Sequence, residues 1–152
     1  ALTRLYSSHA IVRKMIKSAR RKRWIPGEGA IIIVKLLNAE LIGRQIGVHG
    51  LSQVYVKLAN RLVNVVGGMD PVGNYYGGCY LVLIEKMHSA DNVEGLMRRI
   101  KQALSEPLQM DSGVESEPLM PKIGVGQAKL SFSHTDVDAA LYKAQRDAED
   151  TV

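Results

Sequence analysis

The residues of this chain whose spacing could do chemistry are two adjacent glycines between strand-like runs. Gly77 and Gly78 separate residues 72–76 from residues 81–84. Such a pair predicts a tight hairpin whose backbone can approach a phosphate, and phosphoryl chemistry there needs carboxylates beside the turn to hold divalent metal ions. The residues that follow carry a thiol, a phenol and an isobutyl group: Cys79, Tyr80 and Leu81. We therefore predict a turn that has kept its shape without its metal ligands.

Other side chains near this turn have simpler interpretations than catalysis. Cys79 would need a base and a depressed pKa to be a nucleophile, and no histidine motif accompanies it, so we interpret it as a structural thiol. Tyr75, Tyr76 and Tyr80 cluster around the hairpin and could form a stacking or docking surface, although cross-strand packing is the simpler interpretation. We predict no metal site and no cofactor, because the histidines show no ligand spacing with the thiol: His9, His49, His88 and His134.

Length and composition predict one folded domain spanning residues 1–152. The chain is 46% apolar, and its longest apolar run is far below the roughly 20 residues that span a bilayer. No signal-peptide pattern is present, and the single cysteine fits a reducing compartment. Because the first residue is alanine, we expect this domain to be a piece of a longer protein.

The net charge of +5 is concentrated at one end of the chain. Residues 1–24 hold eight basic and no acidic side chains, whereas the rest holds twelve basic and fifteen acidic ones. Four of the cations are consecutive: Arg20, Arg21, Lys22 and Arg23. We interpret them as a solvated helix face, with contact to nucleic acid or anionic lipid as the alternative. Apart from Trp24, no aromatic residue is interleaved with them, so the sequence does not favour DNA as a partner.

Hydrophobic periodicity predicts an α+β domain in the order helix, strand, helix, hairpin, helix, strand, helix. This order gives a βαββαβ core in which helices flank a sheet that contains antiparallel strands. We expect a polar, glycine-containing stretch between the first strand and the second helix, a Ser89 N-cap, and a capping box at Thr135. The expected elements are a helix ending near Arg23, a strand at 31–37, helices at 51–66, 90–104 and 135–148, and a strand at 122–126.

Several motifs in order resemble the GGDEF domain family, the diguanylate cyclase domains of bacterial cyclic-di-GMP signalling. The similarity covers nearly the whole chain. Residues 2–8 resemble the family's opening Leu-Thr-Gly-Leu-Tyr-Asn-Arg, and residues 31–62 align without a gap to its first strand and helix. Gly77-Gly78 take the place of the signature glycines. Residues 122–126 resemble Ser-Ile-Gly-Val-Ala, and residues 137–144 resemble Ala-Asp-x-Ala-Leu-Tyr-x-Ala.

The residues that carry the family's chemistry are replaced in this chain. The metal-binding Asp of the first strand corresponds to Lys35, and the acidic pair after the glycines corresponds to Cys79 and Tyr80. An ammonium would repel Mg²⁺. The family's Arg-x-x-Asp inhibition motif corresponds to residues 68–71, which lack the arginine and hold Asp70 out of register. The guanine-reading Asn and Asp and the phosphate-binding Lys and Arg correspond to Gly43, Ser52, Gln145 and Glu149.

The resemblance therefore implies a catalytically inactive GGDEF-like domain that acts as a regulatory or protein-interaction module. Its partner would be another protein or a second copy of itself, because active family members work as dimers of facing half-sites. The alternative is a non-catalytic module that binds cyclic-di-GMP or GTP through Arg20 to Arg23 and the tyrosines at the hairpin. The family context implies a cytoplasmic domain, in a parent protein that is anchored at the inner face of the bacterial membrane.

Overall fold

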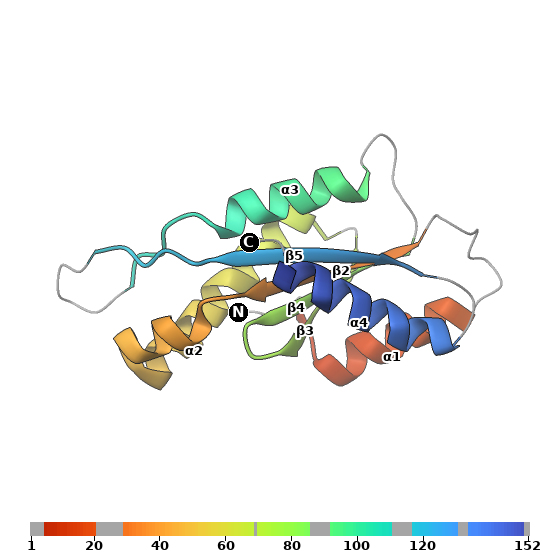
Figure 1. The fold of residues 1–152 in the computed structure, drawn as a ribbon, viewed down its shortest axis with the longest axis horizontal. Helices are drawn as coiled ribbons and strands as arrows, with labels where there is room; N and C mark the ends of the chain where they lie inside the picture. The colour runs from red at the N-terminus through yellow and green to blue at the C-terminus, as the bar shows by residue number, and fades with distance from the viewer. Residues whose placement is uncertain are drawn as a thin grey trace.

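The chain folds into one mixed sheet with helices on both faces, as a computed structural model shows (Figure 1). The structure describes residues 5–20, 29–68, 70–85, 92–110, 117–130 and 134–150, without the side chains of 19, 20 and 134–136. In chain order the elements are β1 (Leu5–Tyr6), α1 (Ser8–Arg20), β2 (Ala30–Leu36), α2 (Ala39–Val66), β3 (Val72–Tyr76), β4 (Cys79–Ile84), α3 (Val93–Leu104), β5 (Ile123–Lys129) and α4 (His134–Asp150).

The strand order in the sheet is β1-β3-β4-β2-β5. Strand β2 pairs antiparallel with both β4 and β5, β3 pairs antiparallel with β4, and β1 is parallel to β3. The run from β2 to β5 is therefore the predicted βαββαβ core, and the predicted α+β class is confirmed. The short β1 was not predicted, because two residues carry no periodicity.

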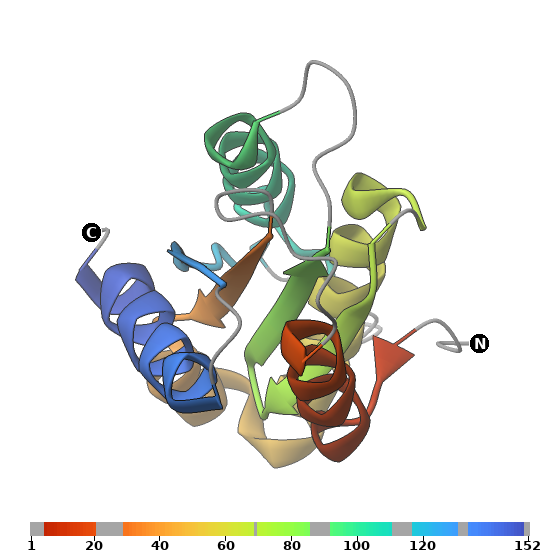
Figure 2. The same cartoon turned by 90° about the vertical axis from the view of Figure 1, so that its right-hand side faces the viewer.

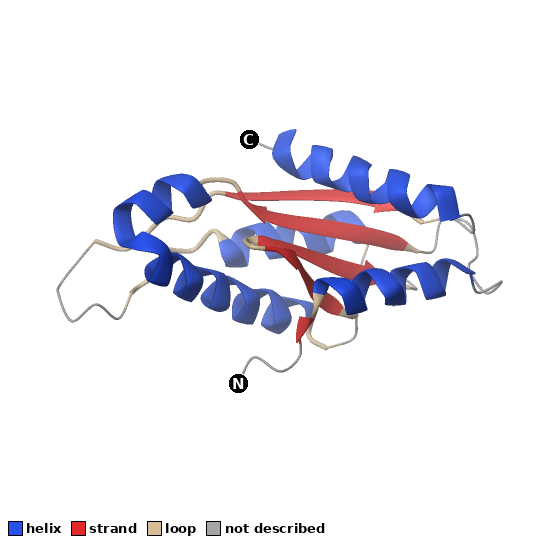
Figure 3. Cartoon of the chain, turned by 90° about the horizontal axis from the view of Figure 1, so that it is seen from below, coloured by secondary structure: helices blue, strands red, loops and turns tan. Residues whose placement is uncertain are grey.

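Alternation along the strands divides the core between two faces of the sheet. Ile32 and Val34 of β2 point toward α2 and α3, on what we name the α2/α3 face. Ile31 and Ile33 point toward α1 and α4, on the α1/α4 face. Both groups of side chains are almost fully buried, which explains the continuous apolar run of β2. Figures 2 and 3 show the strands between these two layers of helices.

Helix α4 lies directly on the edge strand β5. A Cβ at Gly124 would collide with the carbonyl oxygen of Ala148, and one at Gly126 with that of Ala144. These glycines therefore let the helix backbone approach the strand closely. Apolar residues at helical spacing bury one side of α4 against the sheet: Val137, Ala140, Leu141 and Ala144.

The structure corrects several predicted boundaries. The glycine-containing stretch expected as polar and irregular is helical from Ala39, with a kink at Gly47, whose φ of 80° is left-handed. Strand β4 begins at Cys79, two residues before the prediction. Helix α3 begins at Val93, and its N-cap is Asn92, whose side chain accepts a 2.6 Å bond from Gly95 N. The predicted caps Ser89 and Thr135 lie outside the described side chains.

Two side chains brace segments that are distant in sequence. Arg61 of α2 donates to the carbonyl oxygens of Glu106 at 2.6 Å and Pro107 at 2.7 Å, just after α3 ends. Asn38 donates to the carbonyl oxygen of Met120 at 3.0 Å and accepts from the Lys122 N–H at 2.9 Å. Together they fix the two ends of the segment that links α3 to β5.

Candidate functional site

The predicted tight hairpin is present, and an aromatic ring covers its glycines. Gly77 and Gly78 join β3 to β4, and Gly78 has a left-handed φ of 77°. A Cβ placed on Gly78 would lie 2.8 Å from Cε1 of Tyr55, and one on Gly77 would lie 3.3 Å from Cε2 of the same ring. The Tyr55 ring of α2 thus occupies the space that the absence of side chains at these glycines leaves open. The glycine pair has a structural role here that needs no phosphate.

Lys35 forms a compact cluster on the other side of this turn. In the sheet Lys35 of β2 lies directly opposite Cys79 of β4. Its Nζ atom is 3.2 Å from Oε1 of Glu149 on α4 and 5.8 Å from the ring centroid of Tyr76. We name these four residues the lysine corner. The structure therefore brings together two positions, Lys35 and Glu149, that the sequence identified only as separate replacements.

The partners of Lys35 hold it in its charged form. Burial alone would lower the pKa of Lys35, but interactions with the Tyr76 and Glu149 side chains outweigh burial, and the net pKa is raised. Burial also raises the pKa of Tyr76, and the neighbouring Cys79 raises it further. At neutral pH the corner therefore holds a cation, a carboxylate and two neutral groups, which is a poor setting for a divalent cation.

Cys79 and Tyr80 point to opposite faces of the sheet and are both buried. Burial raises the pKa of the Cys79 thiol to about 11. Burial also raises the pKa of Tyr80, whose hydroxyl donates a 2.6 Å hydrogen bond to the backbone oxygen of Tyr55. Neither side chain is ionised near neutral pH, so neither offers the charge that a metal ion needs. The interpretation of Cys79 as a structural thiol fits this burial.

The two positions that correspond to the family's guanine-reading residues lie on either side of the kink in α2. Gly43 precedes the kink at Gly47 and carries no polar side chain; a Cβ there would lie 3.3 Å from Leu51 Cδ2. Ser52 follows the kink and is exposed. Neither residue belongs to the lysine corner. On α4, Gln145 is half-buried one turn before Glu149.

Of the candidate interaction residues, the structure describes the side chains of the two tyrosines only. Arg21, Lys22 and Arg23 lie outside the described residues, as does the side chain of Arg20. The rings of Tyr75 and Tyr76 have centroids 5.5 Å apart, and Tyr76 is 42% exposed. Tyr80 does not join them, because it faces α2.

Sequence reasoning missed Tyr55. Its position next to Val54 and three residues before Leu58, both buried core residues, could have indicated that its ring reaches the sheet. Among the described residues, no group of three or more His, Cys, Asp or Glu side chains could hold a metal ion. Within the same residues, no helix is long and apolar enough to cross a membrane.

No family model and no curated protein matches the chain, whereas solved structures do. The GGDEF domain of FimX from Pseudomonas aeruginosa has a TM-score of 0.80 at 15% identity, covering 98% of this chain and 90% of that chain. The active GGEEF domain of a diguanylate cyclase from Vibrio cholerae has 0.69 at 20%, covering 96% and 89%. The diguanylate cyclase SiaD from Pseudomonas aeruginosa, in complex with its activator SiaC, has 0.75 at 17%, covering 95% and 56%. This chain therefore has the GGDEF-domain fold, as its motifs predicted.

Proposed function

We propose that this chain is a catalytically inactive GGDEF-like domain of a bacterial cyclic-di-GMP signalling protein, where it acts as a regulatory or protein-interaction module. The observation that carries the proposal is the lysine corner. The ammonium of Lys35 is held at 3.2 Å by Glu149, opposite the buried Cys79. The resemblance assigns metal-binding carboxylates to the positions of Lys35 and Cys79. Phosphoryl transfer depends on positioning and charge neutralisation, and this cluster supplies neither to a metal–triphosphate.

The opposite side of the hairpin supports the same proposal. Tyr55 lies over Gly77 and Gly78, and its backbone oxygen is bound by Tyr80. A nucleotide phosphate approaching these glycines from the α2/α3 face would have to displace the ring. Both sides of the turn are thus filled by side chains of the chain itself, while the fold around them is retained.

The interaction role is supported by what a domain of this fold does elsewhere. SiaD was solved in complex with a protein activator, SiaC, so a similar domain occurs in a protein that binds a partner. For this chain we propose a protein partner or self-association. In the same proposal the domain lies on the cytoplasmic side of the bacterial membrane, within a longer signalling protein.

The test is whether the chain makes cyclic-di-GMP. The purified protein is incubated at high concentration with GTP and either Mg²⁺ or Mn²⁺, and the product is separated by chromatography. The active Vibrio cholerae domain serves as the positive control in the same buffer. We expect no product above the buffer blank. Product that scales with the concentration of this chain, and that is lost after heat denaturation, would overturn the proposal.

A second candidate is a non-catalytic nucleotide-binding module, and the exposed ring of Tyr76 beside Tyr75 favours it. Bases stack on such rings, with about 1–3 kcal/mol per base. Titration with cyclic-di-GMP, repeated with the variant Tyr76→Ala, tests this candidate. Saturable binding that Tyr76→Ala weakens would support it, and the absence of binding by the parent protein would exclude it.

A further inference from the structure

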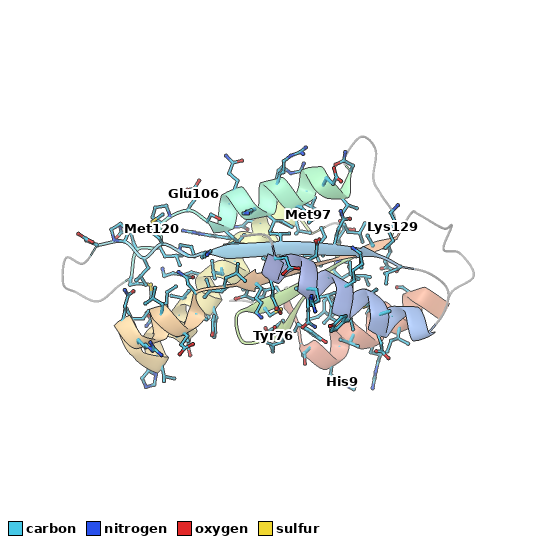
Figure 4. All side chains as sticks on the ribbon, in the orientation of Figure 1. His9, Tyr76, Met97, Glu106, Met120 and Lys129 are labelled. Carbon is cyan, nitrogen blue, oxygen red and sulfur yellow. The ribbon has the colours of Figure 1, made fainter. Side chains whose placement is uncertain are left out.

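An open groove of about 340 Å³ lies between α3 and the edge strand β5. We name it the α3–β5 groove. Figure 4 shows Met97 on α3 above β5, with Tyr76 of the lysine corner below the strand. The groove is thus on the α2/α3 face, away from the lysine corner. Its lining residues are Glu94, Met97, Arg98, Lys101, Val125 and Gln127.

The wall that α3 contributes to the groove carries a net positive charge, from two cations and one carboxylate. Arg98 and Lys101 follow Glu94 by four and seven residues, so all three lie along one stripe of the helix. Arg98 and Lys101 are exposed, and neither side chain forms an ion pair with any residue that the structure describes. Met97 also lines the groove and adds apolar surface. The groove therefore suits an acidic occupant with an apolar side chain.

The strand edge below the groove is closed at Gln127. Its backbone N–H donates to Asp147 Oδ2 at 3.1 Å, and its carbonyl oxygen accepts from Lys143 Nζ at 2.9 Å. Both side chains come from α4. An occupant of the groove cannot use these two groups to add a strand to β5. Recognition must therefore come from side chains.

The chain itself carries a segment of matching chemistry between α3 and β5. We name its described residues, 105–110 and 117–121, the arm; they run side by side from one end of β5 (Figure 1). Reciprocal backbone hydrogen bonds of 2.8 and 2.9 Å join Leu108 to Leu119. The sequence from Gln102 to Pro121 holds no Lys, Arg or His.

The described end of the arm presents acidic and apolar side chains to solvent. Glu106 and Glu117 are exposed and form no ion pair with a described residue. Met120 is 59% exposed, and Figure 4 shows it with Glu106 at the end of the molecule from which the arm projects. Pro107 and Pro118 oppose strand pairing there, so the arm also offers its side chains rather than its backbone.

We infer that two copies of this chain associate by docking the acidic arm of each in the cationic α3–β5 groove of the other. Glu106 and Glu117 of one copy face Arg98 and Lys101 of its partner, and Met120 packs near Met97. In a two-fold arrangement the same arm–groove contact forms twice, and this closes the dimer. The inference gives a partner to the interaction role proposed above and uses a surface away from the lysine corner.

The test is a charge swap followed by analytical ultracentrifugation of the 152-residue chain without nucleotide. We expect the parent chain to dimerise at low salt and to dissociate as salt increases. The groove variant Arg98→Glu/Lys101→Glu and the arm variant Glu106→Lys/Glu117→Lys should each associate at least about tenfold more weakly. An equimolar mixture of the two variants should recover a 1:1 dimer, because each groove then meets an arm of opposite charge.

A matched control reverses two exposed cations on the opposite face of the sheet. The variant Arg13→Glu/Lys17→Glu changes the net charge of the chain by the same amount as the groove variant and should dimerise like the parent. A monomeric parent chain at low salt would overturn the inference, as would a mixture that fails to pair. The assay contains no GTP, so its failure leaves the proposed lack of catalysis untouched.

Discussion

The lysine corner and the α3–β5 groove lie on opposite faces of the same sheet, and they differ in whether their charged side chains form ion pairs within the chain. In the corner, Lys35 meets Glu149 and Tyr76 of its own chain. In the groove, Arg98 and Lys101 form no ion pair with a described residue, although Glu94 lines the same groove. In the proposed function, Lys35 stands at a metal position of the family and is paired within its own chain, so we expect the corner to offer a ligand little binding energy. Where charges remain uncompensated, a partner can still supply the missing interactions.

The largest expected effect on stability comes from disrupting the packing of α4 on β5, because α4 carries Glu149 of the lysine corner. In Gly126→Ala the new Cβ would meet the carbonyl oxygen of Ala144, so α4 must move off β5. We expect a loss of about 3 kcal/mol in the free energy of unfolding, measured by urea denaturation. The control Gly43→Ala places its Cβ against the flexible Leu51 side chain within a helix, and should be neutral or slightly stabilising. Equal stability of Gly126→Ala and the parent would contradict the close packing of α4.

The second prediction concerns the thiol in the corner. Cys79 is fully buried and burial raises its pKa to about 11, so in the folded state it stays protonated until the pH nears that value. We expect a disulfide reagent at pH 8 to react about 100-fold more slowly with the folded chain than with the urea-unfolded chain. Because the folded pKa exceeds the ordinary thiol value of 9.0, the associated stability is present below pH 9 and is lost as the pH rises toward 11. Equal reaction rates in the two states would place the thiol at the surface.

The third prediction tests the aromatic cover of the glycine turn. Tyr80→Phe removes the 2.6 Å hydrogen bond to the Tyr55 backbone oxygen and should cost about 1 kcal/mol of unfolding free energy. Tyr142→Phe is the matched control: its hydroxyl accepts a 3.1 Å bond from Arg146, but the side chain is 64% exposed, so we expect little change. If both variants behave alike, the buried hydrogen bond does not hold Tyr55 in place.

A smaller effect is expected from the ion pair itself. The side chains of Lys35 and Glu149 are 26% and 46% exposed, so solvent screens their attraction. A double-mutant cycle of Lys35→Met and Glu149→Gln should give a coupling of about 0.5 kcal/mol at neutral pH, decreasing with salt. Since the folded pKa of Lys35 is raised above 10.5, the contribution is complete below that pH and is lost as pH rises through the folded value. A coupling of zero at low salt would contradict the expectation that this ion pair stabilises the fold.

The smallest effect on stability should come from the groove. The variant Arg98→Glu/Lys101→Glu should unfold within about 0.5 kcal/mol of the parent, because these side chains have no ion-pair partner among the described residues. Thermal denaturation of the dilute, monomeric protein measures this directly. A loss as large as that of Tyr80→Phe would make the two cations structural and would remove the contrast with the corner.

Much of the fold was predictable because its signals are local. The apolar run of β2, the turn at Gly77-Gly78 and the periodic core of α4 each specify an element without help from the rest of the chain. The start of α2 was not predictable in this way, since its glycines oppose a helix and tertiary packing overrides them. The N-cap was misplaced because several polar residues precede α3, and only the geometry selects Asn92.

The sequence predicted which residues stand at the candidate site but not which of them contact one another. The sequence identified Lys35 and Glu149 as replacements 114 residues apart, but their contact depends on how α4 lies across β5. The contact between the Tyr55 ring and the glycine turn was missed for a similar reason. That contact depends on how α2 packs on the sheet. The groove and the arm carry no motif, and only the sheet order places Arg98 and Lys101 beside the edge strand β5.

The most direct test of the central claim is calorimetric titration of the parent chain with GTP in the presence of Mg²⁺. The claim is that the chain's own side chains, Lys35 with Glu149 and Tyr55 over the glycines, fill the place of a metal–nucleotide complex. We expect no saturable heat with GTP, under conditions where the active Vibrio cholerae domain gives a binding curve. Saturable micromolar binding that requires Mg²⁺ would contradict the account, because it would show that the corner still accepts a metal-bound triphosphate.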